Sequence, residues 1–206
     1  MEGVERYSAA VDGAWSRSAL IGGTATVAGA LAFSRLGRLF EIGEAFAAPS
    51  KGQDIRILQL VLQLEYTQVA LYEQALAQAG LRGELRDFAQ TALGHERAHL
   101  AAIKSALGAN AGAKPGFDFG ETTKSADRFR KAAIKLEDIA VAGYNGQAPN
   151  LTSQTLAAAA EIVSVEARHA AWVRAIAGEI AAPEAVDKPM TAKQVADGLH
   201  EIGLRA

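Results

Sequence analysis

Apolar residues recur every three or four positions through four long stretches of this 206-residue chain, which is the period of an amphipathic α-helix. Asp54 is predicted to cap the first helix, and Gly80 and Gly108 follow the ends of the first two. The pattern predicts four long helices and a short terminal one, over about residues 54–79, 84–107, 122–144, 152–181 and 191–200. We therefore predict an all-α fold.

The lengths of the connections predict how these helices pack. About four residues join the first two helices, and a short turn at Asn145-Gly146 joins the third and fourth, so each pair forms an antiparallel hairpin. Roughly 15 residues separate the two hairpins, and they can reach about 50 Å when extended. A helix of about 25 residues is about 37 Å long, so this crossover can run the length of a four-helix bundle.

Each long helix carries one glutamate in the middle of its apolar face. These residues are Glu65, Glu96, Glu137 and Glu166, each about twelve or thirteen residues into its helix. All four are therefore expected at one level of the bundle. Burying carboxylates without partners costs several kcal/mol per ion, and bound metal is the simplest agent that makes such burial tolerable.

The pattern of candidate ligands occurs twice. Glu-x-x-His occurs at Glu96 and Glu166, and a glutamate followed seven positions later by a tyrosine occurs at Glu65 and Glu137. Residues three apart share a helix face, so the two histidines join the buried glutamates. We predict two copies of one metal-binding hairpin, with the metal ligands Glu65, Glu96, His99, Glu137, Glu166 and His169.

Composition narrows the chemistry of the predicted site. The chain has no cysteine, which excludes disulfides, thiolate metal sites and cysteine nucleophiles. Oxygen and imidazole ligands suit iron or manganese, so we predict two iron ions, with manganese as the alternative. The net charge of −2 favours neither a nucleic acid nor an acidic membrane as partner.

These features resemble those of the ferritin-like superfamily, in which two helices each give a glutamate and two others each give Glu-x-x-His. The stretches LEDIAVAGYNGQAP (Leu136–Pro149) and VEARHAAWVR (Val165–Arg174) are similar more narrowly to bacterial ferritin-like-domain proteins related to plant desiccation-related proteins. The resemblance covers about residues 54–180. It implies that Glu96 and Glu166 bridge two metals and that Glu65 and Glu137 are terminal ligands.

The resemblance implies a di-iron or di-manganese carboxylate protein for redox handling of Fe(II), oxygen or peroxide in stress protection. Such a ferroxidase-like or peroxidase-like oxidoreductase is one hypothesis. A non-catalytic metal-binding or protective protein of the cell envelope is the alternative, and the sequence leaves the choice open. A homo-oligomer is compatible with either hypothesis.

One local motif has a competing interpretation. His95-Glu96-Arg97-Ala98-His99 is H-E-x-x-H, which in a zinc metalloprotease supplies two zinc ligands and a general base. No third histidine of the metzincin type follows, and this interpretation leaves the second Glu-x-x-His unexplained. His95 is then expected at the surface or as a hydrogen-bond partner of a ligand.

Two tyrosines also have two interpretations. Tyr72 and Tyr144 could donate hydrogen bonds to the metal ligands or be redox-active. The interpretation that we favour is that they pack two turns away from the site.

The first 50 residues differ from the rest of the chain. Ala19 to Phe33 is a run of small apolar residues that follows Arg17 and precedes AFAAPS at Ala45–Ser50, the layout of a secretory signal. SRSALIGG resembles a twin-arginine export signal with Ser18 in place of the second arginine. We predict an exported or envelope-associated protein, with membrane association through residues 19–33; an extra packing helix in a cytoplasmic protein is the alternative.

The chain is therefore divided into three predicted parts. Residues 1–50 are the export-signal-like or anchor segment, which forms a helical extension. Residues 51–182 form the ferritin-like four-helix domain, and residues 183–206 form a tail with a short helix.

Overall fold

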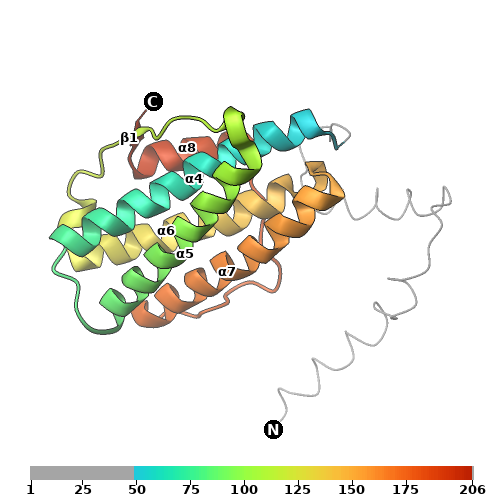
Figure 1. The fold of residues 1–206 in the computed structure, drawn as a ribbon. Coiled ribbons are helices and arrows are strands. Elements are labelled where there is room, and N and C mark those ends of the chain that lie inside the picture. The colour runs from blue at the N-terminus through green and yellow to red at the C-terminus, as the bar shows by residue number, and fades with distance from the viewer. Residues whose placement is uncertain (1–48, 206) are drawn as a thin grey trace, which may run out of the picture. The chain divides into compact units, whose positions relative to one another are not determined.

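The computed structural model describes residues 49–205. Four long helices form a bundle, and a fifth, shorter helix packs on its side (Figure 1). They are α4 (Lys51–Gln78), α5 (Gly83–Leu107), α6 (Ala126–Gln147), α7 (Ser153–Ala177) and α8 (Ala192–Ile202). The predicted export signal, helical extension and membrane association lie outside the described residues. Within residues 49–205, no helix combines the length and apolar character needed to cross a membrane.

The connections give the predicted topology of two hairpins. Short turns join α4 to α5 and α6 to α7, and the second turn includes η3 (Ala148–Asn150). The crossover from α5 to α6 runs along the bundle (Figure 1) and contains η1 (Gly108–Asn110), β1 (Gly116–Phe117) and η2 (Thr122–Lys124). The predicted all-α bundle with a long crossover and a short C-terminal helix is confirmed.

The start of α4 differs from the prediction. Ser50 caps the helix, because its hydroxyl accepts the backbone N–H of Gln53 at 3.2 Å. Asp54 lies inside the first turn and accepts hydrogen bonds from the backbone N–H of Thr152, at 2.9 Å, and from the Thr155 hydroxyl, at 2.7 Å. Asp54, the predicted cap, thus links α4 to the start of α7.

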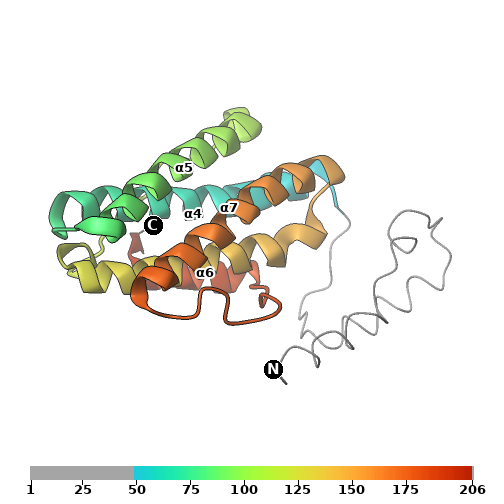
Figure 2. The ribbon, with the colours of Figure 1, turned by 90° about the horizontal axis from the view of Figure 1, so that it is seen from below.

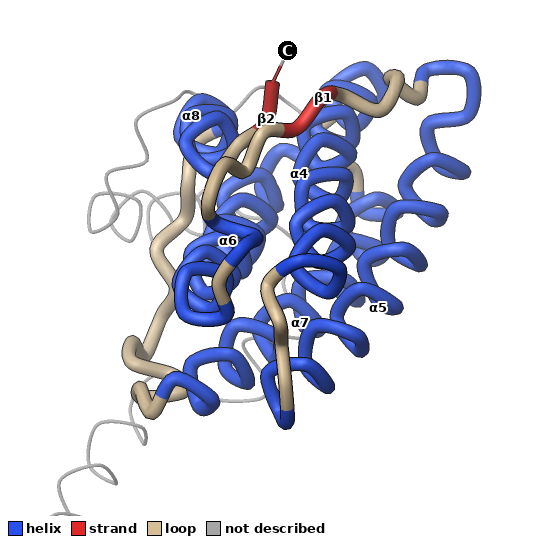
Figure 3. The backbone as a smooth tube through the Cα atoms, turned by 90° about the vertical axis from the view of Figure 1, so that its left-hand side faces the viewer, coloured by secondary structure: helices blue, strands red, loops and turns tan. Residues whose placement is uncertain are grey.

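The end of the chain also differs from the prediction. Helix α7 stops at Ala177, four residues early, because Gly178 adopts the left-handed conformation with φ of 74°. Thr191 and Gln194 form a capping box that starts α8. After α8, β2 (Leu204–Arg205) pairs antiparallel with β1 and attaches the tail to the crossover (Figure 3).

The two hairpins do not pack equally along their length. The last turns of α5 diverge from the other helices (Figure 2). In that half of α5, Ala101, Ala102 and Ala106 are exposed, as are Ala157, Ala158 and Ala160 in the first half of α7. The bundle is therefore closed around its middle and more open at this end.

Candidate metal centre

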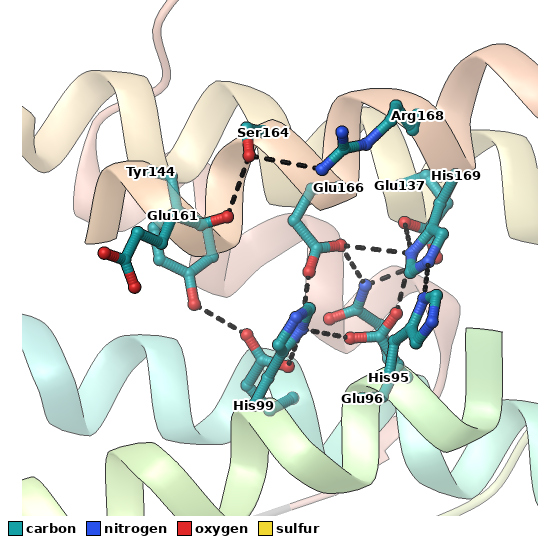
Figure 4. A network of polar contacts seen from close by, with 12 residues as sticks. His95, Glu96, His99, Glu137, Tyr144, Glu161, Ser164, Glu166, Arg168 and His169 are labelled. Atoms are coloured by element: carbon teal, nitrogen blue, oxygen red, sulfur yellow. Dashed lines mark hydrogen bonds and ion pairs between the residues drawn. The ribbon is translucent and has the colours of Figure 1, made fainter. Parts of the chain in front are cut away.

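The six predicted ligands meet in the middle of the bundle (Figure 4). Helices α4, α5, α6 and α7 each place one glutamate there, and all four glutamates have no exposed surface. The two histidines lie beside them, with His169 2% exposed and the His99 side chain 11% exposed. The apolar stripe of each helix faces the core, so a glutamate within that stripe is carried inward with it.

The first histidine is surrounded by three carboxylates. The Nδ1 atom of His99 lies 2.9 Å from Glu96 Oε2 and 2.9 Å from Glu166 Oε1. It also lies 3.6 Å from Glu65 Oε2. These four side chains form one group of donors whose atoms all lie within 4.8 Å of one another.

The second histidine has the matching arrangement. The Nδ1 atom of His169 lies 2.9 Å from Glu96 Oε1 and 3.6 Å from Glu137 Oε2. Glu166 Oε2 is 3.9 Å away. Glu96 and Glu166 thus belong to both groups, each with one oxygen directed to each histidine. Two carboxylates shared between two metal ions, each ion also held by one further glutamate and one histidine, would have this geometry.

The donor atoms fit metal binding. Five buried atoms of the cluster make no hydrogen bond of acceptable geometry, although some lie 2.9 Å from an opposite partner in an ion pair. They are Glu65 Oε2, Glu96 Oε1, Glu137 Oε2, Glu166 Oε1 and His169 Nδ1. Buried polar atoms without partners are costly and rare in folded proteins. Carboxylate oxygens and imidazole nitrogens are hard or intermediate donors, so this cluster could bind metal ions.

Two tyrosines hold two of the candidate ligands, Glu65 and Glu137. The Tyr144 hydroxyl on α6 donates to Glu65 on α4 at 2.7 Å. The Tyr72 hydroxyl on α4 donates to Glu137 on α6. The favoured prediction, that both tyrosines only pack away from the site, is wrong, and the alternative of donation to the ligands is confirmed. Each tyrosine donates to a glutamate of the other hairpin. The spacing of seven residues does not reveal this, because it relates each tyrosine to a glutamate on its own helix.

Sequence reasoning missed Gln68. Its amide nitrogen donates to Glu166 Oε2 at 2.9 Å and to Glu137 Oε1 at 3.3 Å, and the residue is fully buried. The available signal was its position, since Gln68 follows Glu65 by three residues and shares its face of α4. A glutamine on an apolar stripe, beside a predicted ligand, needs a polar partner there.

His95 lies at the edge of the centre. It is an exposed residue whose ring stacks on that of His169, with ring centroids 5.1 Å apart. Its Nδ1 lies 2.9 Å from His169 Nε2, the nitrogen opposite the one that faces the carboxylates. His95 therefore orients a candidate ligand. Within residues 49–205 it belongs to no group of candidate ligands, so the two histidines of H-E-x-x-H do not converge.

The family model of the ferritin-like domain matches residues 53–179, which is more than half of the chain. The chain belongs to the ferritin-like domain family. No curated protein matches it. The matched region of the ferritin-like domain runs through all four long helices and holds all six candidate ligands.

Burial raises the pKa of two carboxyls in this ferritin-like domain. The pKa of Glu65 rises to about 8, because burial outweighs the contact with His99. The pKa of Glu166 lies well above its usual range through burial and repulsion from Glu96. In the metal-free domain, both groups therefore take up protons readily.

The groups between them shift in the opposite sense. Burial alone would raise the pKa of Glu96, but contacts with His169 and His99 lower it to about 2. Burial alone would lower the pKa of the histidines, but the carboxylates raise it to about 12 for His99 and about 10 for His169. Protons thus supply the positive charge that cations would bring to the cluster.

The two halves of the centre are not equivalent. Gln68 donates to Glu137 and Glu166, and His95 contacts His169. The residues at the repeat-related positions are Ala140, three after Glu137, and Val165, one before Glu166. Neither alanine nor valine has a polar side chain. The half formed by Glu137 and His169 therefore has two hydrogen-bonding supports that the half formed by Glu65 and His99 lacks.

Proposed function

We propose that the cluster binds two divalent iron ions, with manganese as the alternative. Glu65 and His99 would hold one ion, Glu137 and His169 the other, and Glu96 and Glu166 would be shared. Two divalent cations carry a charge of +4 and four glutamates carry −4, so the loaded centre would be neutral.

The burial of four glutamates at one level carries this proposal. All four have no exposed surface, and each keeps one oxygen without a hydrogen-bond partner. An uncompensated buried carboxylate costs several kcal/mol, so four together need positive charge, which protons supply in the metal-free protein and two cations would supply in the loaded centre. Cations satisfy all four at once, and the mixed oxygen and nitrogen donors suit iron or manganese.

We further propose that the centre handles Fe(II), oxygen or peroxide in protection against stress. Bound iron would supply the change of oxidation state. The chain's own residues would fix the ligands: Tyr144 and Tyr72 orient the terminal carboxylates, and His95 orients His169. Buried apolar side chains, including Phe88 against His169, limit the access of water, which strengthens these polar contacts.

A non-catalytic role is the second candidate. Each group of candidate ligands draws on three of the four long helices, so two metal ions bound there would together crosslink the entire bundle. Such a protein would use metal for stability, in line with the proposed relation to desiccation-related proteins.

We propose export to the cell envelope for either role, from the signal-like pattern of residues 1–50, and sequencing of the mature N-terminus tests it.

Metal analysis and turnover distinguish the two roles. Purified protein should hold about two Fe or Mn per chain, and Glu96→Ala should lose both, because Glu96 lies in both groups. Aerobic Fe(II) or peroxide should then be consumed rapidly by the parent protein and not by Glu96→Ala. Stoichiometric metal without turnover supports the structural role. One zinc per chain, lost in His95→Ala, would contradict the di-metal proposal.

A further inference from the structure

A cavity of about 730 Å³ opens at the end of the bundle where α5 diverges. Its walls come from all four long helices and are mostly aliphatic. They include Ile55 and Leu58 of α4, Ile103 of α5, and Ala159 and Ile162 of α7. Sites for small organic ligands have volumes of about 300 to 1,000 Å³ and mainly apolar walls. Dioxygen or peroxide alone needs no space of this size.

The cavity shares a wall with the candidate metal centre. Tyr144 lines the cavity, and its hydroxyl donates to Glu65 at 2.7 Å. Figure 4 shows this ring on the same side of the cluster as His99. A molecule in the cavity therefore contacts the residue that positions a terminal ligand.

Charge is confined to one end of the cavity. Lys51 and Asp54 are its only charged lining residues. The Asp54 carboxylate is already engaged by Thr152 and Thr155, and hydrogen bonds from them lower its pKa despite the opposing effect of burial. Among residues 49–205, Lys51 makes no ion pair. The cavity thus offers an aliphatic interior and one exposed cation, Lys51, near a carboxylate that is already hydrogen-bonded to Thr152 and Thr155.

We infer that this cavity binds an unbranched aliphatic chain with an anionic end group, such as a medium-chain carboxylate. The chain would lie between α5 and α7, and the anionic group would face Lys51. That this ligand is also the substrate of the metal centre rests on the proposed function. Binding itself depends only on the cavity.

Calorimetric titration of the full-length, metal-free protein with dodecanoate, below its micelle concentration, tests binding. Shortening the ligand to decanoate removes two buried CH₂ groups, each worth about fourfold in affinity, so binding should weaken about 15-fold. Lys51→Gln should weaken dodecanoate binding and leave dodecanol binding unchanged. No saturable binding, or no dependence on chain length, would overturn the inference.

Two neighbouring alanines provide a matched pair of variants. Ala159 lines the cavity, whereas Ala160 is exposed on the same helix and does not line it. Ala159→Phe should fill the cavity and lower dodecanoate affinity at least tenfold, and Ala160→Phe should not. Equal effects of the two variants, with unchanged circular dichroism, would refute binding in this cavity.

The same samples separate this inference from the proposed function. Metal loading is measured independently, with Co(II) absorbance as the readout. Loading without dodecanoate binding would overturn the inference alone, and dodecanoate binding without loading would overturn the proposed function alone. If both hold, dodecanoate should shift the Co(II) spectrum in the parent protein and not in Ala159→Phe.

Discussion

Tyr144 on α6 donates a hydrogen bond to Glu65 on α4, 79 residues away in sequence. The hydroxyl reaches across the two hairpins and satisfies one oxygen of a fully buried carboxylate. The other oxygen, Oε2, stays without a hydrogen-bond partner beside His99. Tyr144 therefore holds one oxygen of Glu65 in a hydrogen bond and leaves the other oxygen as the candidate metal donor.

Removal of this hydroxyl should weaken metal binding. Tyr144→Phe leaves Glu65 free to rotate, and the loss of such a partner typically costs 10- to 100-fold in metal affinity. Chelator competition with Mn(II) measures the change. Tyr66→Phe is the control, because Tyr66 of α4 is also buried, whereas the tyrosine hydrogen bonds to the candidate ligands come from Tyr72 and Tyr144. Equal affinities for the two variants would contradict the role of Tyr144.

The inequivalent halves of the centre should be visible in a metal titration. His95→Ala removes the partner of His169 Nε2, so the ion at Glu137 and His169 should weaken about 10-fold or more. The other ion should keep its affinity, which turns one binding phase into two. Arg97→Ala is the control, since Arg97 is exposed and pairs with Glu73. A uniform loss at both positions would argue against inequivalence.

The stability of the metal-free protein should fall as pH rises from about 5 to about 8. Folding raises the pKa of Glu65 from 4.5 to about 8 and that of His99 from 6.5 to about 12. In this window the folded state holds more protons than the unfolded state, so the free energy of unfolding decreases with pH. Thermal unfolding in chelator at several pH values measures this decrease. A rise in Tm across the window would contradict the assigned shifts.

Metal should reverse this dependence. Cations displace the protons, so Mn(II) should stabilise the protein more at pH 8 than at pH 5. At 100-fold excess over Kd, a single site gives about 2.7 kcal/mol, or roughly 5 to 10 °C in Tm. Absence of a Tm increase at pH 8 would count against a metal centre.

Neutralising one shared carboxylate should stabilise the metal-free protein. Glu166→Gln keeps the shape of the side chain and removes a charge that burial and Glu96 both disfavour. Unfolding in urea should show a gain of about 1 kcal/mol or more at pH 8, because each unit by which folding raises a carboxyl pKa costs about 1.4 kcal/mol above that pKa. The stabilisation by metal should disappear. Glu161→Gln, at an exposed position of the same helix, should change neither quantity.

Close packing of the tail makes a further stability prediction. Gly146 on α6 lies against the backbone of Met190, whose carbonyl oxygen would be 1.9 Å from an added Cβ. Gly146→Ala should therefore displace the tail and destabilise the protein by about 2 kcal/mol or more. Gly94→Ala in α5 meets nothing within 4 Å and should stabilise by about 1 kcal/mol. Urea unfolding compares the two, and a neutral Gly146→Ala would contradict this packing.

The sequence by itself determined the helices and the level of the glutamates. Both follow from local rules: the 3.6-residue period shows which side chains share a face, and the lengths of the connections show which helices are neighbours. A glutamate such as Glu65 inside an apolar stripe must be carried into the core. The six candidate ligands could therefore be named from spacing alone, and the structure brings them together.

Only the tertiary structure decided which groups support those ligands. Gln68 contacts Glu166 across 98 positions, and His95 contacts His169 across 74. Asp54 reaches Thr152 rather than capping its own helix. No periodicity encodes such pairs, because they depend on the rotation and offset of whole helices that packing sets. The pairing of β1 with β2 and the cavity beside Tyr144 arise in the same way, from where the helices come to rest.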